Sequence, residues 1–448
     1  MAKKYDVIVV GAGPAGFLAA KAAGENGLEV ALLERKSDPT QLTRACAQTL
    51  TAMNEYWLGT MVRYNTRDKR ICFPSDGFSF KYDGPYENLY ILRVYAPNGH
   101  KVDFGDYEQQ KRQGDYGRVG LAFDKEALLR CLLEQVKACS VDVFPGVNVE
   151  KVTGTAEGVR VEGSGQSFEG AYVIAADGVN SRIAQTMGFN KERTYYFNVY
   201  AMTYYMTGLE LKEPHDVMIK TATILKEGDA SLYVAPRPTE GEYNILVLSL
   251  NPRVDLETAL DYFMNRAFCA PWFKKAKKLK ALSAVINCYS PMVEPYRDRV
   301  LVIGDVGSLV DLENHGAMLS GWKAGQAIST AVQEGNLGLE ITGISQYVNW
   351  WKEAYINAYN HEDLIKGFAL PYILTKDEEI NYLYGLIKET LPAVWSPEGA
   401  SRAMRPVLAK AMPIIERERP DIFQKLQRRG LPATQLLAEL TKISKPVS

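Results

Sequence analysis

A glycine-rich loop between two apolar runs near the N-terminus constrains the fold more than any other feature of this chain. Residues 7–10 are continuously apolar and β-branched, which predicts a buried parallel strand rather than a half-exposed one. The loop Gly11-Ala12-Gly13-Pro14-Ala15-Gly16 follows, then a helix-like stretch and a second apolar run that ends at Glu34. Strand, glycines, helix and acid in this order predict a Rossmann-type βαβ unit that binds a dinucleotide.

The residue types in this unit also restrict the ligand. Gly11 allows a tight turn, Gly13 lets the backbone approach a pyrophosphate, and Gly16 lets the helix pack close to the sheet. The phosphates would lie at the positive end of the helix. Glu34 would accept hydrogen bonds from ribose hydroxyls and would repel a 2′-phosphate. The unit by itself therefore predicts NAD or FAD, and not NADP.

Composition excludes several classes of function. A chain of 448 residues suggests two or three structural units, and 52 basic against 53 acidic residues leave no overall charge that favours nucleic acid. The six cysteines and four histidines show no metal-ligand spacing, so we expect no metal site and reduced thiols in a cytoplasmic protein. The first residues do not read as a signal peptide, and no apolar run is long enough to span a bilayer, although peripheral membrane contact stays open.

The rest of the chain alternates between two kinds of pattern. A helix is expected to end at Met61, short strands follow over residues 62–118, and a buried strand leads into Asp177-Gly178. Residues 193–285 are rich in strands and aromatic residues, with one or two helices over residues 254–280. The buried parallel pattern returns only at residues 299–305, and helix formers dominate after Gly316. The nucleotide-binding domain is therefore predicted to be discontinuous.

We expect a mixed α/β fold with three parts. A discontinuous Rossmann-like domain would comprise residues 1–61, 116–190 and 286–330. An antiparallel-sheet substrate domain would comprise residues 62–115 and 191–285, and residues 331–448 would form a helical C-terminal region. The basic, amphipathic tail of that region could cover a pocket, lie on a membrane, or simply form a solvated helical face.

Three separated motifs together resemble the FAD-dependent oxidoreductases of the aromatic-hydroxylase and geranylgeranyl-reductase superfamily. They are the glycine loop with Glu34, the turn that begins at Asp177-Gly178, and the turn at Gly304-Asp305. Residues 95–99 and 231–236 resemble segments of the geranylgeranyl-reductase branch. The resemblance implies that FAD is the cofactor, that Asp305 binds the ribityl portion, and that the helix after it points its N-terminus at the flavin ring.

The resemblance also implies a set of site residues. Cys46 falls where this branch carries a cysteine that faces the flavin, and His315 is a second candidate for acid or base catalysis. Arg118 is the nearest candidate for an arginine that the family places close by. The predicted cofactor-binding residues are Gly11, Gly13, Ala15, Gly16, Glu34, Arg35, Arg44, Ala45, Cys46, Arg118, Val149, Asp177, Gly304, Asp305, Gly316 and Ala317.

Three functions are compatible with these motifs. The first is a reductase or dehydrogenase that acts on a C=C bond of an apolar, polyprenyl-like substrate. The second is a monooxygenase that hydroxylates an aromatic or polyketide-like molecule, and the third is a flavoprotein that passes electrons to a quinone. The chain shows no second glycine-loop nucleotide fold, so reducing equivalents would come from transient NAD(P)H binding or from a protein such as ferredoxin. Tyr200, Tyr204, Tyr205 and Tyr233 would either line the substrate pocket or form the core of the sheet.

Overall fold

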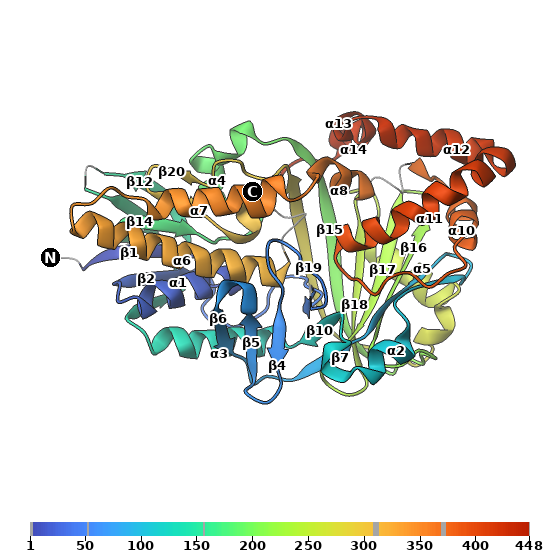
Figure 1. Ribbon diagram of the computed structural model, residues 1–448, viewed down its shortest axis with the longest axis horizontal. Helices are drawn as coiled ribbons and strands as arrows, with labels where there is room; N and C mark the ends of the chain where they lie inside the picture. Colours follow the sequence, from blue (N-terminus) through green and yellow to red (C-terminus); the bar gives the residue numbers. More distant parts are fainter. Residues whose placement is uncertain (1–2, 52, 156, 308–312, 369–372, 448) are drawn as a thin grey trace.

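Two large sheets lie side by side along the long axis of the molecule, with helices packed against both (Figure 1). The computed structural model describes residues 3–51, 53–155, 157–307, 313–368 and 373–447. The predicted fold class is confirmed, because a Rossmann-like domain, an antiparallel-rich sheet and a helical C-terminal region are all present.

The first sheet is built around parallel strands from three distant parts of the chain. Its main strand order is β11-β2-β1-β14-β13-β12. In addition, β21 pairs in parallel with the C-terminal end of β14. The parallel strands are β1 (Lys4–Val10), β2 (Val30–Glu34), β11 (Val141–Pro145), β14 (Gln166–Ala175) and β21 (Val300–Val302). The antiparallel strands are β12 (Val149–Gly154), β13 (Val159–Gly163) and β20 (Tyr296–Arg297).

The central strands of this sheet are buried on both faces, as their continuous apolar sequences predict. Val7 and Val9 of β1 pack into one core, and Ile8 and Val10 pack into another on the opposite face. Helices α1 (Pro14–Glu25), α3 (Lys125–Lys137), α6 (Asn314–Asn336) and α7 (Gly343–Trp351) contribute to the first of these cores. The α1–α6 contact is close, because a Cβ at Gly321 would lie 2.1 Å from the carbonyl oxygen of Ala15. This contact sets the N-terminus of α6 beside the glycine loop.

The second sheet carries the aromatic segment of the sequence. Its strand order is β19-β15-β18-β17-β16-β8-β9, and all its pairs are antiparallel except β16 with β8. The strands are β8 (Ile91–Tyr95), β9 (Lys101–Phe104), β15 (Tyr195–Thr207), β16 (Val217–Ile224), β17 (Asp229–Pro236), β18 (Glu242–Ser249) and β19 (Lys277–Tyr289). Helix α5 (Leu256–Asn265) packs on one face.

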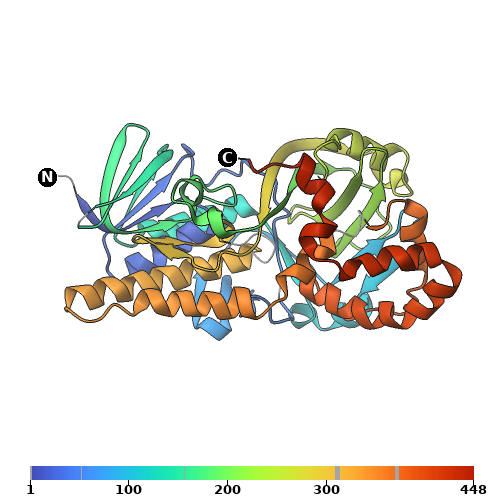
Figure 2. The same cartoon turned by 90° about the horizontal axis from the view of Figure 1, so that it is seen from above.

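The C-terminal helices cover part of the other face of the second sheet (Figure 2). Leu92 and Phe104 of the sheet share a core with Leu391 and with Ala403 of α11. These helices are α8 (His361–Phe368), α10 (Asp377–Gly385), α11 (Pro397–Glu418), α12 (Pro420–Gln427), α13 (Ala433–Leu436) and α14 (Ala438–Ile443). Their apolar sides are therefore used in packing on this chain.

Smaller elements join the two sheets. One three-stranded sheet has the order β3-β10-β7, and a second has the order β4-β5-β6. Their strands are β3 (Thr49–Leu50), β4 (Arg63–Asn65), β5 (Arg70–Phe73), β6 (Phe78–Lys81), β7 (Tyr86–Leu89) and β10 (Gly120–Phe123). Two short helices, α2 (Tyr107–Arg112) and α4 (Arg182–Thr186), lie in connections.

The structure corrects two expectations about local structure. The helix expected to end at Met61 is absent from the described part of that segment, where residues 53–61 form turns and Leu58 has a positive φ of 55°. Tertiary burial of Trp57 overrides helix propensity there. The helices predicted over residues 254–280 are present as α5 and a short 3₁₀ helix (Ala270–Phe273), and only their end differs, because the chain enters β19 at Lys277.

Candidate cofactor-binding and active site

The glycine loop has the geometry that a bound diphosphate requires. Gly11 has a φ of +103°, and a Cβ there would lie 2.3 Å from the carbonyl oxygen of Ala176. A Cβ at Gly16 would lie 1.8 Å from the carbonyl oxygen of Gly11, so only glycine lets α1 start this close to β1. A Cβ at Gly13, by contrast, would meet nothing within 4 Å. The loop is thus packed on one side and open at the N-terminus of α1.

Glu34 is positioned at the end of β2 by two backbone groups. Its carboxylate accepts hydrogen bonds from the amide of Ala12 at 2.7 Å and from the amide of Lys36 at 2.9 Å. Both bonds orient the side chain along the cavity wall, and each oxygen keeps a lone pair for another donor. This is the arrangement that a ribose hydroxyl pair would use.

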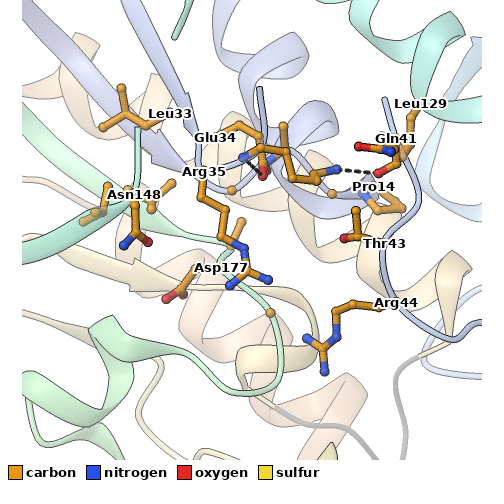
Figure 3. A pocket seen from close by; sticks show the side chains of 18 of the residues that line it. Pro14, Leu33, Glu34, Arg35, Gln41, Thr43, Arg44, Leu129, Asn148 and Asp177 are labelled. Carbon is orange, nitrogen blue, oxygen red and sulfur yellow. Dashed lines mark hydrogen bonds between the residues drawn. The ribbon is translucent and has the colours of Figure 1, made fainter. Parts of the chain in front are cut away.

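A cavity of about 410 Å³ runs along the carboxyl ends of β1, β2 and β14. Most of the predicted cofactor residues of the N-terminal half line it, and Figure 3 shows Glu34, Arg35, Arg44 and Asp177 on its walls. Basic groups from separate segments, including Arg44 of a loop and Lys125 at the start of α3, face it together with Asp305. Such a site suits an anionic ligand held by both backbone amides and cationic side chains.

A second cavity of about 250 Å³ continues from the first toward the second sheet. Both cavities share Pro14, Leu42, Arg44, Lys125 and Asp305 on their walls. The second is closed by Cys46, by Ala284 and Ile286 of β19, and by Asn314 and Ala317 of α6. The two therefore form one elongated site that extends from Glu34 to the N-terminus of α6.

Cys46 and Lys125 are in contact inside the second cavity. The Nζ atom of Lys125 lies 3.5 Å from Sγ of Cys46 and donates to Oδ1 of Asn314 at 3.0 Å. The amide of Gln48 also donates to the sulfur at 3.4 Å. The sulfur of Cys46 is thus contacted by two N–H donors, Nζ of Lys125 and the amide of Gln48, and both Cys46 and Lys125 line the cavity.

The second sheet holds the Cys46 segment in place. The side-chain amide of Asn244 donates to the carbonyl oxygens of Cys46 and Ala47, each at 2.9 Å. Gln48 donates to the hydroxyl of Tyr205 at 2.7 Å. These residues lie on β18 and β15, so the sheet positions a loop that follows the nucleotide-binding unit. None of the four tyrosines proposed for the pocket lines either cavity, and Tyr205 acts through Gln48.

The N-terminus of α6 presents Glu313 and Asn314 to the cavity, and not His315. Burial, with the nearby charge of Asp305 as a further cause, raises the pKa of Glu313 to about 7. His315 is fully buried, its Nδ1 lies 3.5 Å from Oγ1 of Thr51, and burial lowers its pKa to about 3. His315, predicted as a candidate acid or base, therefore lies away from the cavity, because its place one residue after Asn314 on α6 directs the side chain into the core.

The structure brings most of the other predicted residues to the site and leaves some away from it. Ala45 lines the second cavity and Val149 the first. Ala15, Gly16, Gly304 and Gly316 shape the surrounding backbone without lining either cavity. Arg118 lies elsewhere, since it donates to the carbonyl oxygen of Asp115 at 2.7 Å and pairs with the Asp115 carboxylate. A buried arginine with these local partners has no contact with the cavities.

Sequence reasoning did not select several residues that the fold brings to the site. Lys125, Asn148, Asn180 and Arg182 line the first cavity, and Lys125 also lines the second. Lys125 directly follows Asp124, whose side chain accepts from the amide of Ala127 as the cap of α3. A basic residue beside a helix cap was the available signal, but its approach to Cys46 depends on tertiary packing.

Comparison with known proteins agrees with this geometry. A family model described as an FAD binding domain matches residues 4–305. The chain belongs to this FAD-binding family. It is an FAD-dependent oxidoreductase, as predicted, and the comparisons below confirm its resemblance to the geranylgeranyl-reductase branch.

Relatives of known name cover almost the whole chain. The digeranylgeranylglycerophospholipid reductase of Methanosarcina acetivorans is 25% identical over 398 residues, which are 86% of this chain and 89% of the relative. The enzyme of the same name from Methanococcus vannielii is 26% identical over 404 residues, or 88% of this chain and 93% of the relative.

Solved structures share the fold. A geranylgeranyl bacteriochlorophyll reductase-like protein from Thermoplasma acidophilum superposes with a TM-score of 0.67 at 18% identity, covering 95% of this chain and 99% of that protein. A myxobacterial chondrochloren halogenase superposes with a TM-score of 0.60 at 17% identity, covering 98% and 96%. At these identities the likeness concerns the fold alone.

The residues present fit FAD along its whole length. The open space at Gly13 and the amides at the start of α1 suit the pyrophosphate, and Glu34 suits the adenosine ribose. Asp305 lines both cavities, so its carboxyl group would be available to the hydroxyls of a ribityl chain. The 23-residue helix α6 directs its positive end at the second cavity, which would favour an anionic reduced flavin.

Proposed function

We propose that this protein reduces a C=C bond of a polyprenyl-like substrate, or dehydrogenates the corresponding single bond. The observation that carries the proposal is the second cavity, in which a thiol, an ammonium group and a carboxyl group face one space at the flavin end of the site. The names of the relatives that match across most of their length support this substrate class.

FAD, when bound, would supply the hydride. In the direction of reduction the chain must then supply one proton to the second carbon of the double bond. We assign this proton to Sγ of Cys46, because Cys46 lines the cavity and the ammonium group of Lys125 lies 3.5 Å from its sulfur, close enough to replace the proton. Lys125 then returns a proton to the sulfur and regains one from water, and Asn314 holds Lys125 in position at 3.0 Å.

Glu313 is the second proton-holding group in this cavity. A pKa of about 7 makes its carboxyl group roughly half protonated at neutral pH, which suits proton exchange with the cavity. Ala284 and Ile286 of β19 give the opposite wall an apolar character. An apolar wall facing proton donors matches a hydrocarbon double bond better than a polar aromatic ring.

The electron donor, the partners and the location belong to the same proposal. We expect NAD(P)H or a ferredoxin-like protein to supply electrons, and a small apolar molecule to be the substrate. No helix of the described residues is long and apolar enough to cross a membrane. We propose a cytoplasmic protein that makes peripheral contact with the membrane from which an apolar substrate is drawn.

The proposal is tested with FAD-loaded protein reduced by dithionite without oxygen and then given a geranylgeranyl lipid. We expect flavin reoxidation together with a product two hydrogens heavier per reduced double bond, measured by mass spectrometry. Cys46→Ala should keep bound FAD and lose at least about 100-fold in rate, a typical loss for an acid catalyst. Reoxidation that requires oxygen, with stoichiometric oxygen consumption coupled to product, would establish the monooxygenase reading instead.

A further inference from the structure

A third cavity, separate from the cofactor site, lies between the second sheet and the C-terminal helices. Its volume is about 250 Å³. Its floor consists of Leu92 and Val94 of β8 with Val102 and Phe104 of β9, and its roof includes Met404 and Leu408 of α11. The walls are thus hydrocarbon on both sides, and the cavity is below the ~300–1,000 Å³ typical of a site that encloses a whole ligand.

One lysine lies on the floor of this hydrocarbon space. Lys220 of β16 lines the cavity, and its Nζ lies 5.0 Å from the centroid of the Tyr233 ring. Among the described residues it has no carboxylate within ion-pair distance. Interaction with Tyr233 raises the pKa of Lys220 in spite of burial, so its side chain is cationic at neutral pH. An apolar cavity with a charged group and no counter-ion is costly unless a ligand supplies the opposite charge.

The other charged residues of the cavity are also basic. Lys366, Arg405 and Arg429 line it, and no acidic residue does so among the described residues. Lys366 is paired with Glu362 at 3.3 Å, and Arg405 lies 3.7 Å from Asp363. Both of these cations therefore have a carboxylate counter-ion within the protein. Among the described residues, Lys220 and Arg429 are the lining cations without a carboxylate partner, and Lys220 is the one on the sheet floor, where an anionic ligand would meet it.

Lys220 lies on the same face of the second sheet as residues of the cofactor site, four strands away. Lys220 pairs across the sheet with Tyr233, then Leu246, then Thr203, then Leu282. Residues along such a row share one face, and Ala284, two residues beyond Leu282 on β19, lines the second cavity. Four strand spacings separate β16 from β19, which amounts to about 19 Å.

We propose that the third cavity binds the phosphate end of a substrate amphiphile, with Lys220 as its charge partner. This inference rests on the proposed function, since it assigns one end of the substrate of that same reaction. The hydrocarbon chain would leave the cavity and follow the sheet face toward Cys46. Because the cavity takes only one end of a ligand, the site would select molecules by the anionic group and by the length of chain that reaches the flavin.

The test compares the binding of geranylgeranyl phosphate, geranylgeraniol and inorganic phosphate to the FAD-loaded protein by calorimetry. We expect geranylgeranyl phosphate to bind at least about tenfold more tightly than geranylgeraniol, and inorganic phosphate at millimolar concentration not to compete. Lys220→Met should remove this preference and leave geranylgeraniol binding unchanged. Lys226→Met, at an exposed lysine in the turn after β16, should bind both lipids like the unmodified protein.

A second variant keeps the proposal testable if Lys220→Met does not fold. Leu92→Trp fills the cavity and should weaken geranylgeranyl phosphate binding without releasing FAD. Unchanged binding in either folded variant, or equal binding of the phosphate and the alcohol, would overturn the assignment. Competition by inorganic phosphate would also overturn it, since it would show an anion site without chain recognition.

The outcomes separate the two proposals. If the protein reduces geranylgeranyl lipids while the folded Lys220 variants bind and react normally, the proposed function stands and this inference fails. If the protein reduces no such lipid but loses phosphate selectivity in Lys220→Met, the binding site stands and the proposed function fails.

Discussion

At the scale of single residues, the site depends on polar groups whose environment is set by a few specific contacts. The carboxylate of Glu34 is oriented by two amides, and the thiol of Cys46 is contacted by Lys125. Glu313 and Asp305 share a buried region, and burial raises the pKa of both.

Glu34→Gln should weaken FAD binding by roughly tenfold, because charge-assisted hydrogen bonds are stronger than neutral ones by about 1–2 kcal/mol. The same change at Glu29, an exposed carboxylate just before β2, should leave the affinity unchanged. Fluorescence titration of the apoprotein with FAD measures both values. Equal affinities of the two variants would show that Glu34 does not contact the cofactor.

Glu313→Gln should change how stability depends on pH. The folded protein holds this proton up to a pKa of about 7, whereas the ordinary value is 4.5. The folded state thus binds more protons between these values, and the stability that Glu313 contributes is lost as the pH rises from about 4.5 to 7.

The variant lacks this loss. The difference between its melting temperature and that of the unmodified protein should therefore shift in favour of the variant as the pH rises from about 4.5 to 7. The full effect is about 3 kcal/mol. Thermal melts of the apoproteins at pH 5, 6, 7 and 8 provide the measurement. Parallel curves for the two proteins would mean that Glu313 titrates normally.

At the scale of elements, the first turn of α1 combines a packing requirement with a binding requirement. Gly16 is pressed against the carbonyl oxygen of Gly11, and Gly13 faces open space. The same loop therefore contains one glycine that the fold needs and one that the ligand needs.

The two substitutions to alanine should separate these roles. Gly13→Ala should fold with an unchanged apoprotein melting temperature, because the new methyl group meets no atom and the φ of −81° is allowed for alanine. It should nevertheless bind FAD at least about tenfold more weakly, since the methyl group occupies the approach of the pyrophosphate. Gly16→Ala should lower the free energy of unfolding of the apoprotein by about 3 kcal/mol or more, and its melting temperature should fall accordingly. Calorimetry with and without FAD distinguishes the two, and a stable Gly16→Ala protein would contradict this account.

At the scale of the whole molecule, segments hundreds of residues apart hold one another. Glu55, just after the Cys46 segment, accepts hydrogen bonds from the amides of Trp395 and Ser396 at 3.1 and 2.8 Å. It also accepts from the hydroxyl of Ser396 at 2.8 Å. These bonds join the N-terminal part of the chain to the start of α11, which covers the third cavity.

Glu55→Gln should destabilise the protein by about 2 kcal/mol, because a buried carboxylate at a helix N-terminus loses its charge and one acceptor. Glu398→Gln, in the first turn of the same helix but paired with Arg402, should cost less than about 0.5 kcal/mol. Urea unfolding measures both. An equal loss in the two variants would show that Glu55 is an ordinary helix-end charge.

The division of the chain at residues 61, 115, 190, 285 and 330 remains our proposal for its domains.

The sequence by itself determined the cofactor, because the pattern that indicates it is local. A strand, a turn and a helix start place Gly11, Gly13 and Glu34 within one βαβ unit, and the return of the chain at Gly304-Asp305 is visible as a buried strand. Only the tertiary structure decided which side chains share the active site. Lys125 meets Cys46 across 79 positions of sequence, and His315 turns away while Glu313 faces the cavity. These outcomes depend on how α3 and α6 pack against the sheets. Local sequence patterns do not predict such contacts, because the contacting residues are far apart in the sequence.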